Sequence, residues 1–250
     1  MTGILSVEAL TVSFGSVRAL DGVSVELPPG VNGVLGPNGA GKTTLFRVLT
    51  LGLRPRSGSV AYDGVALSST RVRQAYQRSV GYLPQDPGWF EGFTALELCE
   101  YMAGLRLVPR RSRLGAAKSA LSAVGLEHAA STKLSALSGG QRRRAFLAQA
   151  LVHDPAVLIL DEPTAGLDPV QRIQLRELVQ QLGSARMVLL STHLVEDVAH
   201  SCERVFVLNE GHVVWTGSPG ALQRVGEQSA VSATVSPYEQ GFLAVLAGLA

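Results

Sequence analysis

The sequence has few cysteines and no long apolar run. Only two cysteines occur among 250 residues, Cys99 and Cys202, and neither has the spacing of a metal site or a disulfide framework. We therefore expect a reduced, intracellular chain. No stretch reaches the roughly 18 consecutive apolar residues of a membrane-spanning helix, and the start of the chain lacks an apolar signal core. These absences predict a chain that is soluble by itself.

A broad charge of one sign is also missing. The chain carries 22 Lys and Arg against 20 Asp and Glu, so it lacks the extended basic surface of a nucleic-acid-binding protein. Local basic spots occur at Arg110, Arg111 and Arg113 and at residues 142–144, and we interpret them as solvated helix faces. The length is enough for a substantial core in one domain with a subdomain, or in two compact lobes.

Two kinds of strand follow one another along the sequence. Residues 4–14 and 23–27 have strand-like alternation, which predicts an antiparallel N-terminal sheet. Gly15 and the Asp-Gly pair at residues 21–22 separate these two runs. Further short apolar strands are expected at residues 31–35, 79–83, 156–160, 187–191 and 205–208. Because helical segments flank them, we expect a mainly parallel sheet that is covered by helices.

Between residues 85 and 151 the pattern changes to helical periodicity. It predicts an inserted α-helical subdomain over approximately residues 86–150. We place the main domain over residues 1–217 and a C-terminal extension of unclear role over residues 218–250. Residues 218–237 are loosely polar and are interpreted as a connector. The apolar segment 241–250 is too short for a membrane anchor, so we expect a packed terminal helix.

Residues 36–44 read GPNGAGKTT and match the phosphate-loop pattern GxxxxGK[ST] between an apolar strand and a helix. Small residues let backbone N–H groups surround phosphate oxygens at the positive end of the helix. Lys42 can reach the β- and γ-phosphates, the Thr43 hydroxyl can ligate magnesium, and Thr44 can add a phosphate hydrogen bond. A plain helix cap leaves the Lys-Thr pair unexplained, although it accounts for Gly36, Gly39 and Gly41.

An acidic pair ends the apolar strand at residues 156–160. Asp161 and Glu162 are placed at the carboxyl edge of the sheet, where ligands of α/β proteins gather. Asp161 is expected to hold magnesium through water, and Glu162 to polarise the water that attacks the γ-phosphate. The alternative is a solvated acidic turn, which the phosphate loop elsewhere in the chain makes the weaker interpretation.

A third motif, LSGGQ, occupies residues 137–141. Ser138 and Gln141 fit a capping box at the start of a helix. That interpretation leaves Gly139 and Gly140 unexplained, because glycine in a first turn costs about 1 kcal/mol relative to alanine. We infer that something approaches this backbone closely. A helix start with bare amides and a serine hydroxyl is an anion site, which predicts a second phosphate contact.

The three motifs in this order resemble the nucleotide-binding subunit of ABC (ATP-binding cassette) transporters, over roughly residues 4–217. LSGGQ is the family's own signature, whereas many NTPases share the phosphate loop. The expected fold class is α/β, with a P-loop NTPase core built on a mainly parallel sheet, an N-terminal antiparallel β subdomain and the inserted α-helical subdomain. The resemblance implies ATP and Mg²⁺ as cofactors and a head-to-tail dimer, in which each ATP lies between one phosphate loop and the partner's signature.

The resemblance also assigns roles to single residues. Gln85 matches the glutamine that touches magnesium and the attacking water, with a surface loop amide as the alternative. His193 resembles the switch histidine that contacts the γ-phosphate. Asp168 belongs to the dimer-interface loop, in which Ala165 replaces the family's usual serine; Asp168 also serves simply as a helix start. Phe14 stands where the family usually stacks a tyrosine on adenine, and its ring keeps the stacking face.

The full set of expected site residues falls into three groups. The catalytic group is Glu162, His193 and Gln85, and the magnesium group is Thr43, Gln85 and Asp161. The nucleotide contacts are expected from Phe14, Gly36, Asn38, Gly39, Ala40, Gly41, Lys42, Thr43, Thr44, Ser138, Gly139, Gly140, Gln141 and Asp168.

Residues 86–93, DPGWFEGF, hold Trp89, Phe90 and Phe93 in a turn-rich loop. By family analogy, a cytoplasmic coupling helix of a membrane partner docks about here. Alternatively, the rings close the core of the helical subdomain. Both interpretations stay open from the sequence.

The resemblance implies an ATPase subunit that drives a separate transmembrane permease subunit and forms a homodimer with two competent sites. Such a subunit is cytoplasmic and lies on the inner face of the cell membrane through the permease. The stretches PRSGSVAYDG, GYLPQDPGW and STHLVEDV resemble cassettes of export systems. One alternative is a soluble ABC-type ATPase that acts on ribosomes or DNA, although no nucleic acid is expected. Another is a non-hydrolysing regulatory module, against which Glu162 and His193 count.

Overall fold

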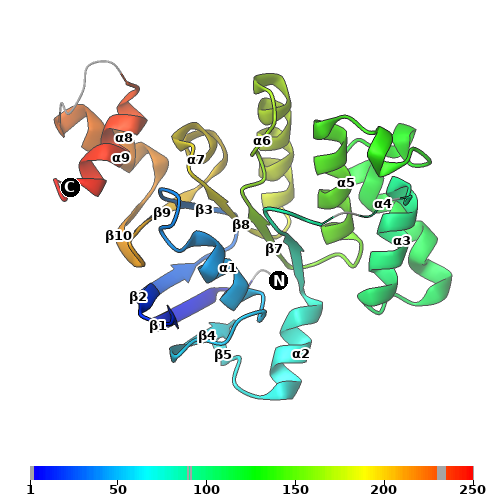
Figure 1. Cartoon of the computed structure of the whole chain (residues 1–250), viewed down its shortest axis with the longest axis horizontal. Helices are drawn as coiled ribbons and strands as arrows, with labels where there is room; N and C mark the ends of the chain where they lie inside the picture. Colours follow the sequence, from blue (N-terminus) through cyan, green and yellow to red (C-terminus); the bar gives the residue numbers. More distant parts are fainter. Residues whose placement is uncertain (1–2, 89, 91, 230–234, 250) are drawn as a thin grey trace.

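The computed structural model describes residues 3–88, 90, 92–229 and 235–249, which form two β-sheets with helices around them (Figure 1). The strands are β1 Leu5–Phe14, β2 Val17–Leu27, β3 Val31–Leu35, β4 Ser57–Tyr62, β5 Val65–Ala66, β6 Val80–Leu83, β7 Val157–Asp161, β8 Met187–Thr192, β9 Arg204–Asn209 and β10 His212–Gly217. The α-helices are α1 Lys42–Leu49, α2 Thr70–Arg78, α3 Ala95–Leu105, α4 Arg113–Ala123, α5 Gly139–Leu151, α6 Pro169–Gly183, α7 Val195–Ser201, α8 Pro219–Ser229 and α9 Pro237–Leu246. Short 3₁₀ turns are η1 Arg110–Ser112, η2 Glu127–Ala129 and η3 Leu134–Ala136.

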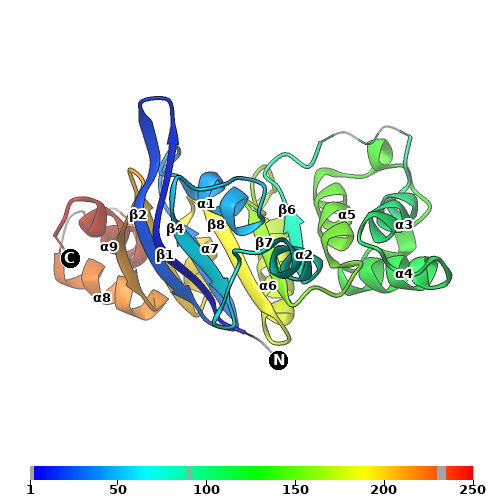
Figure 2. The same cartoon turned by 90° about the horizontal axis from the view of Figure 1, so that it is seen from below.

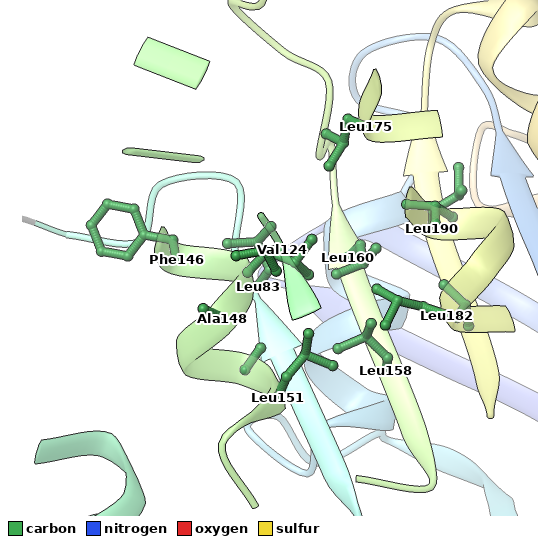
Figure 3. Close-up of a cluster of buried hydrophobic side chains, with 14 of the residues drawn as sticks. Leu83, Val124, Phe146, Ala148, Leu151, Leu158, Leu160, Leu175, Leu182 and Leu190 are labelled. Carbon is green, nitrogen blue, oxygen red and sulfur yellow. The ribbon is translucent and has the colours of Figure 1, made fainter. Parts of the chain in front are cut away.

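The larger sheet has the order β10-β9-β3-β8-β7-β6, in which only β10 runs antiparallel to its neighbour. Its central strands are buried on both faces, which explains their continuous apolar sequences. Val157 and Ile159 of β7 face the core shared with α1 and the antiparallel sheet, whereas Leu158 and Leu160 face the helices (Figure 3). The fold class expected from the sequence is confirmed.

The smaller sheet, with the order β2-β1-β4-β5, is antiparallel and packs against the larger one (Figure 2). The expected turn at Gly15 is present, but the break expected at residues 21–22 is wrong. Strand β2 runs through these residues, and its pairing with β1 shifts register there because Gly22 takes a φ of +66°.

Helices α3, α4 and α5 gather at one end of the molecule, and α8 and α9 at the other (Figure 2). Helix α3 starts with a capping box of Thr94 and Glu97. In the loop before it, Phe90 lies 6.3 Å from the Phe146 ring and 5.9 Å from the Phe93 ring. These two rings therefore close the core beside α5, whereas Trp89 falls outside the described residues. The boundaries of the helical subdomain stay a prediction.

Helix α5 covers the outer edge of β6, the last strand of the larger sheet. The Gln149 side-chain amide donates to the Tyr82 carbonyl at 3.3 Å, and His153 Nε2 lies 3.1 Å from the Val80 carbonyl. Leu147, Ala150 and Leu151 are buried beside these polar contacts. An exposed strand edge invites unwanted pairing, so a helix that satisfies its carbonyls protects the sheet.

The C-terminal segment forms two packed helices. Gly226 of α8 and Gly241 of α9 face each other so closely that an added Cβ on either would meet backbone of the other helix. The packed terminal helix is confirmed, but the interpretation of residues 218–237 as a connector is wrong for α8. Within the described part of the chain, no helix is long and apolar enough to cross a membrane.

His153 predicts a pH-dependent stability. Burial, reinforced by Arg106, lowers the pKa of His153 from 6.5 to about 4, although the Val80 carbonyl opposes this shift. Because the unfolded chain binds this proton near pH 6.5 and the folded chain only near pH 4, the free energy of unfolding should fall as pH decreases through that window. Urea unfolding at pH 7 and pH 5 should show a smaller pH difference in His153→Gln than in the parent. Equal differences would contradict the assignment.

Candidate nucleotide site

The phosphate loop joins β3 to α1 at the carboxyl edge of the larger sheet. Gly41, the residue before α1, has a φ of +108°, a conformation that side chains rarely adopt. A Cβ at this position would also lie 2.4 Å from the Ala19 carbonyl oxygen. Glycine is therefore required here, and the first backbone amides of α1 stay open toward the loop.

The Lys42 ammonium is buried within this loop. It donates to the carbonyls of Gly36 at 2.7 Å and Pro37 at 3.1 Å. It also lies 3.4 Å from Oε1 of Glu162, and both side chains are only 6% exposed. The loop and the acidic end of β7 are thus joined by one ion pair.

Asp161 ends β7 opposite Ser191 of β8, which donates its hydroxyl to Asp161 Oδ1 at 2.6 Å. The second carboxyl oxygen, Oδ2, is buried and has no hydrogen-bond partner. Burial raises the pKa of Asp161, while the Ser191 hydrogen bond and the nearby Thr43 hydroxyl oppose the shift. An orphaned carboxyl oxygen beside a threonine hydroxyl is a hard oxygen donor set, so these residues fit a magnesium ion.

Glu162 follows directly and has an unusual backbone. Its φ of +47° lies in the left-handed region, which is strained for a residue with a Cβ. Its N–H donates to Ser191 Oγ at 2.9 Å, and Oε2 lies 2.9 Å from Nδ1 of His193. A carboxylate only accepts, so the histidine nitrogen carries the proton between them. The predicted catalytic pair therefore meets in one place.

An open groove of about 350 Å³ brings half of the expected residues together. We call it the phosphate groove; it is lined by Ala19, Asn38, Gly39, Ala40, Gly41, Lys42, Thr43, Thr44, Gln85 and Glu162. A second groove of about 710 Å³, the lateral groove, shares Thr43 and Gln85 and extends past Asp161 toward Arg47 and Arg106. Phe14 lines neither groove and is 48% exposed at the end of β1, so its stacking role stays a prediction.

The signature residues lie apart from the phosphate groove. Ser138 and Gln141 form the expected capping box at the start of α5. Ser138 and Gly139 are exposed, and none of residues 137–141 lines the phosphate groove. Asp168 is likewise exposed, and it caps α6 by accepting from the Gln171 amide at 2.8 Å.

The two signature glycines differ from each other. At Gly140 an added Cβ would lie 2.6 Å from the side chain of Gln171, so this chain itself fills the space. These atoms are the end of a flexible side chain, so the phosphate contact expected at Gly140 stays a prediction. At Gly139 nothing lies within 4 Å, and the position is open to an outside group.

Sequence reasoning missed two site residues. Ser191 bridges Asp161 and Glu162. The sequence does indicate it, because Ser191 and Thr192 form a polar pair at the end of an apolar strand. Arg143 is 9% exposed, so the interpretation of residues 142–144 as a solvated face is wrong there. Its position three residues after Gly140 and four before Leu147 puts it on the buried side of α5, a periodicity that the sequence does contain.

Comparisons with known proteins identify the family of the chain. The profile of the ABC transporter family matches residues 20–165. The lipopolysaccharide export system ATP-binding protein LptB of Haemophilus influenzae is 33% identical over 220 residues, which cover 86% of this chain and 91% of that protein. The Nod factor export ATP-binding protein I of Burkholderia lata is 39% identical over 212 residues, which cover 84% of this chain and 69% of that protein.

A solved structure resembles the whole fold. The structure of cbiO1 from Clostridium perfringens, part of the ABC transporter complex cbiONQ, superposes with a TM-score of 0.79 and 30% identity, over 92% of this chain and 96% of that one. The family profile spans more than half of the sequence, and all three motifs are present: the phosphate loop, the acidic strand end and the signature. The chain therefore belongs to the ABC transporter family as one of its ATP-binding, ATP-hydrolysing subunits.

Proposed function

We propose that the chain powers an exporter: two copies close head to tail around two MgATP, and this closure drives a separate transmembrane subunit. The observation that carries the proposal is the exposed helix start at Ser138 and Gly139, which lies outside the phosphate groove of its own chain. Open amides at a helix start bind anions, so this surface suits the phosphates held by a second copy. The exposed loop before Asp168 would face the same partner.

Within one copy, each group of the site has a separate task. Lys42 and the first amides of α1 bind the phosphates, and Asp161 and Thr43 would hold Mg²⁺. Bound there, Mg²⁺ neutralises charge on the phosphate oxygens. Glu162 accepts a proton from the attacking water, and His193 fixes the orientation of that carboxylate. Gln85 lines both grooves and is placed to sense the nucleotide and the lateral groove together.

The lateral groove supports a membrane partner. This groove of about 710 Å³ runs from Asp161 and Gln85 toward Arg106, next to the loop that carries Phe90. A cytoplasmic segment of a permease seated there would contact Gln85 directly and would hold the chain at the inner face of the membrane. We infer export as the direction from the names of two relatives, which assign them to lipopolysaccharide export and Nod factor export.

Two other functions predict different behaviour. A regulatory module would bind MgATP without turnover, and a soluble cassette acting on ribosomes or DNA would copurify with nucleic acid. The pairing of the buried Glu162 with the buried Lys42 and with the exposed His193 supports a hydrolytic site. Copurification with a membrane subunit would support the exporter.

Replacing Glu162 with Gln should separate binding from hydrolysis. Without the general base, hydrolysis should slow on the order of a hundredfold or more, while MgATP stays bound. The variant should therefore accumulate as a dimer that encloses nucleotide, measured by light scattering during size-exclusion chromatography with MgATP. A variant that stays monomeric with MgATP bound would refute the shared site.

Replacing Lys42 with Ala should chiefly weaken binding. Loss of a buried charged donor to the phosphates is expected to raise the Kd for ATP about 10- to 100-fold, measured by fluorescence with a labelled nucleotide. An unchanged Kd would show that this ammonium does not contact the phosphates.

The open signature glycine offers a test in which stability and activity move in opposite directions. Gly139→Ala meets no atom within 4 Å in its own chain and should raise the free energy of unfolding by up to about 1 kcal/mol. The added methyl should nevertheless obstruct the partner's nucleotide and reduce ATP turnover. Gly115→Ala on α4 is the matched control, because that glycine is also exposed and unobstructed. Equal turnover in both variants would contradict the role of Gly139.

A further inference from the structure

One buried guanidinium, that of Arg143, joins three segments of the proposed active site. Nε donates to the Pro163 carbonyl at 2.9 Å, and Nη2 donates to the carbonyls of Glu162 at 2.6 Å and Asp161 at 3.0 Å. Nη1 donates to the carbonyl of Gln85 at 3.2 Å and, more weakly, to that of Pro84 at 3.5 Å. The planar fork of arginine has the donors for such a convergent set, which a single ammonium lacks.

These contacts continue the row that joins α5 to the edge of β6. Carbonyls of alternate residues, Val80, Tyr82 and Pro84, meet His153, Gln149 and Arg143 in turn. The contacts at Tyr82 and Val80 lie two and four residues before Pro84 along the chain. Arg143 is the member of the row at the end where the strand becomes the Gln85 loop. It therefore combines the edge-covering role of its neighbours with contact to β7.

The backbone of Glu162 explains why a cation is needed there. Its positive φ turns the carbonyls of three consecutive residues, from Asp161 to Pro163, toward one point. Such a strained conformation costs of order 1–3 kcal/mol and persists only when its surroundings hold it. Ser191 holds the amide of Glu162, and Arg143 holds its carbonyl. Both contacts fix the direction in which the carboxylate leaves the backbone.

Arg143 forms no ion pair within the residues that the structure describes, and its close partners are backbone carbonyls. Burial lowers the pKa of Arg143, and the nearby carboxylates of Asp161 and Glu162 oppose this shift. A cation that binds through carbonyls leaves both carboxylates free for other groups. Asp161 keeps its unpartnered oxygen, and Glu162 keeps its contacts with Lys42 and His193.

We propose that Arg143 is a positioning residue for ATP hydrolysis: it fixes the positions of Glu162 and Gln85 relative to each other and couples both residues to the signature helix α5. The proposal rests on the proposed catalytic role of Glu162. Because Ser138 caps the same helix, a displacement of the signature moves the guanidinium that fixes the catalytic backbone. A misplacement of about 1 Å at a reacting group can reduce a rate on the order of a hundredfold.

The test compares Arg143→Met and Arg143→Lys with Gln149→Met. Gln149 is buried on the same helix and donates to the same strand edge, but its partner is the Tyr82 carbonyl rather than the catalytic segment. Arg143→Met should lower kcat on the order of tenfold to a hundredfold with an unchanged Kd for MgATP. Arg143→Lys should retain an intermediate kcat, since its ammonium reaches fewer of the carbonyls. Gln149→Met should lower the Tm but leave kcat unchanged.

The measurements are thermal unfolding, MgATP binding and single-turnover hydrolysis, with Glu162→Gln as the reference. The proposal is overturned if Arg143→Met keeps the parent kcat, if Gln149→Met loses as much kcat, or if the loss is in Kd alone. If Arg143→Met does not fold, the reduced kcat of Arg143→Lys at unchanged Kd carries the test. Parent turnover in Glu162→Gln would overturn the catalytic assignment, and with it this proposal. A reduced kcat in Glu162→Gln together with the parent kcat in Arg143→Met would overturn the Arg143 proposal alone.

Discussion

Lys42 and Glu162 face each other in the buried edge of the sheet, and the rest of the site is arranged to make that burial tolerable. A charge removed from water is costly unless it is paired and hydrogen-bonded, and breaking one partner leaves the other uncompensated. The ammonium therefore also donates to two carbonyls of the phosphate loop, and the carboxylate also meets His193. In the proposed function, the phosphates of ATP replace the carboxylate as the partner of Lys42, because they bring negative charge to the same donors. Binding and catalysis thus share one electrostatic balance.

The fold places this pair where strands end and where two structural units meet. β3 and β7 bring the phosphate loop and the acidic pair to one edge, and β8 adds Ser191 between them. α5 approaches from the helical end and reaches the same point through Arg143. Because α5 also begins with the exposed signature, the site has a rigid element that extends from the catalytic backbone to the proposed partner surface. If Arg143 positions Glu162 as proposed, a rotation of the helices shifts the Glu162 backbone without any change in the sheet.

The sequence predicted those parts of the molecule whose local pattern and tertiary role agree. Continuous apolar strands such as 157–161 could be recognised because both faces are buried, and the phosphate loop because its glycines and Lys-Thr pair have one common purpose. β4 and β10 were missed because few of their side chains are buried, so alternation is faint. Arg143 was misread because three adjacent arginines suggest solvent, whereas the side of the helix decides burial. The side chain beside Gly140 is that of Gln171 from helix α6, and the local sequence around Gly140 does not indicate this contact.

Two features of the site, an unpartnered carboxyl oxygen and a strained backbone, destabilise the folded chain, and we infer that they serve ligand binding. Asp161 keeps one buried oxygen without a partner, and burial raises its pKa. A carboxyl group whose folded pKa is raised favours the folded state most when protonated, and this contribution is lost as pH rises through the folded value. At neutral pH its charge is therefore a cost, and a bound cation offsets that cost. The left-handed backbone of Glu162 adds strain to the same few residues. The site therefore carries both the cost of the Asp161 charge and the strain of the Glu162 backbone, and contacts from Ser191 and Arg143 hold it in this conformation. A ligand that binds only the folded chain raises its free energy of unfolding by mass action and so offsets these costs.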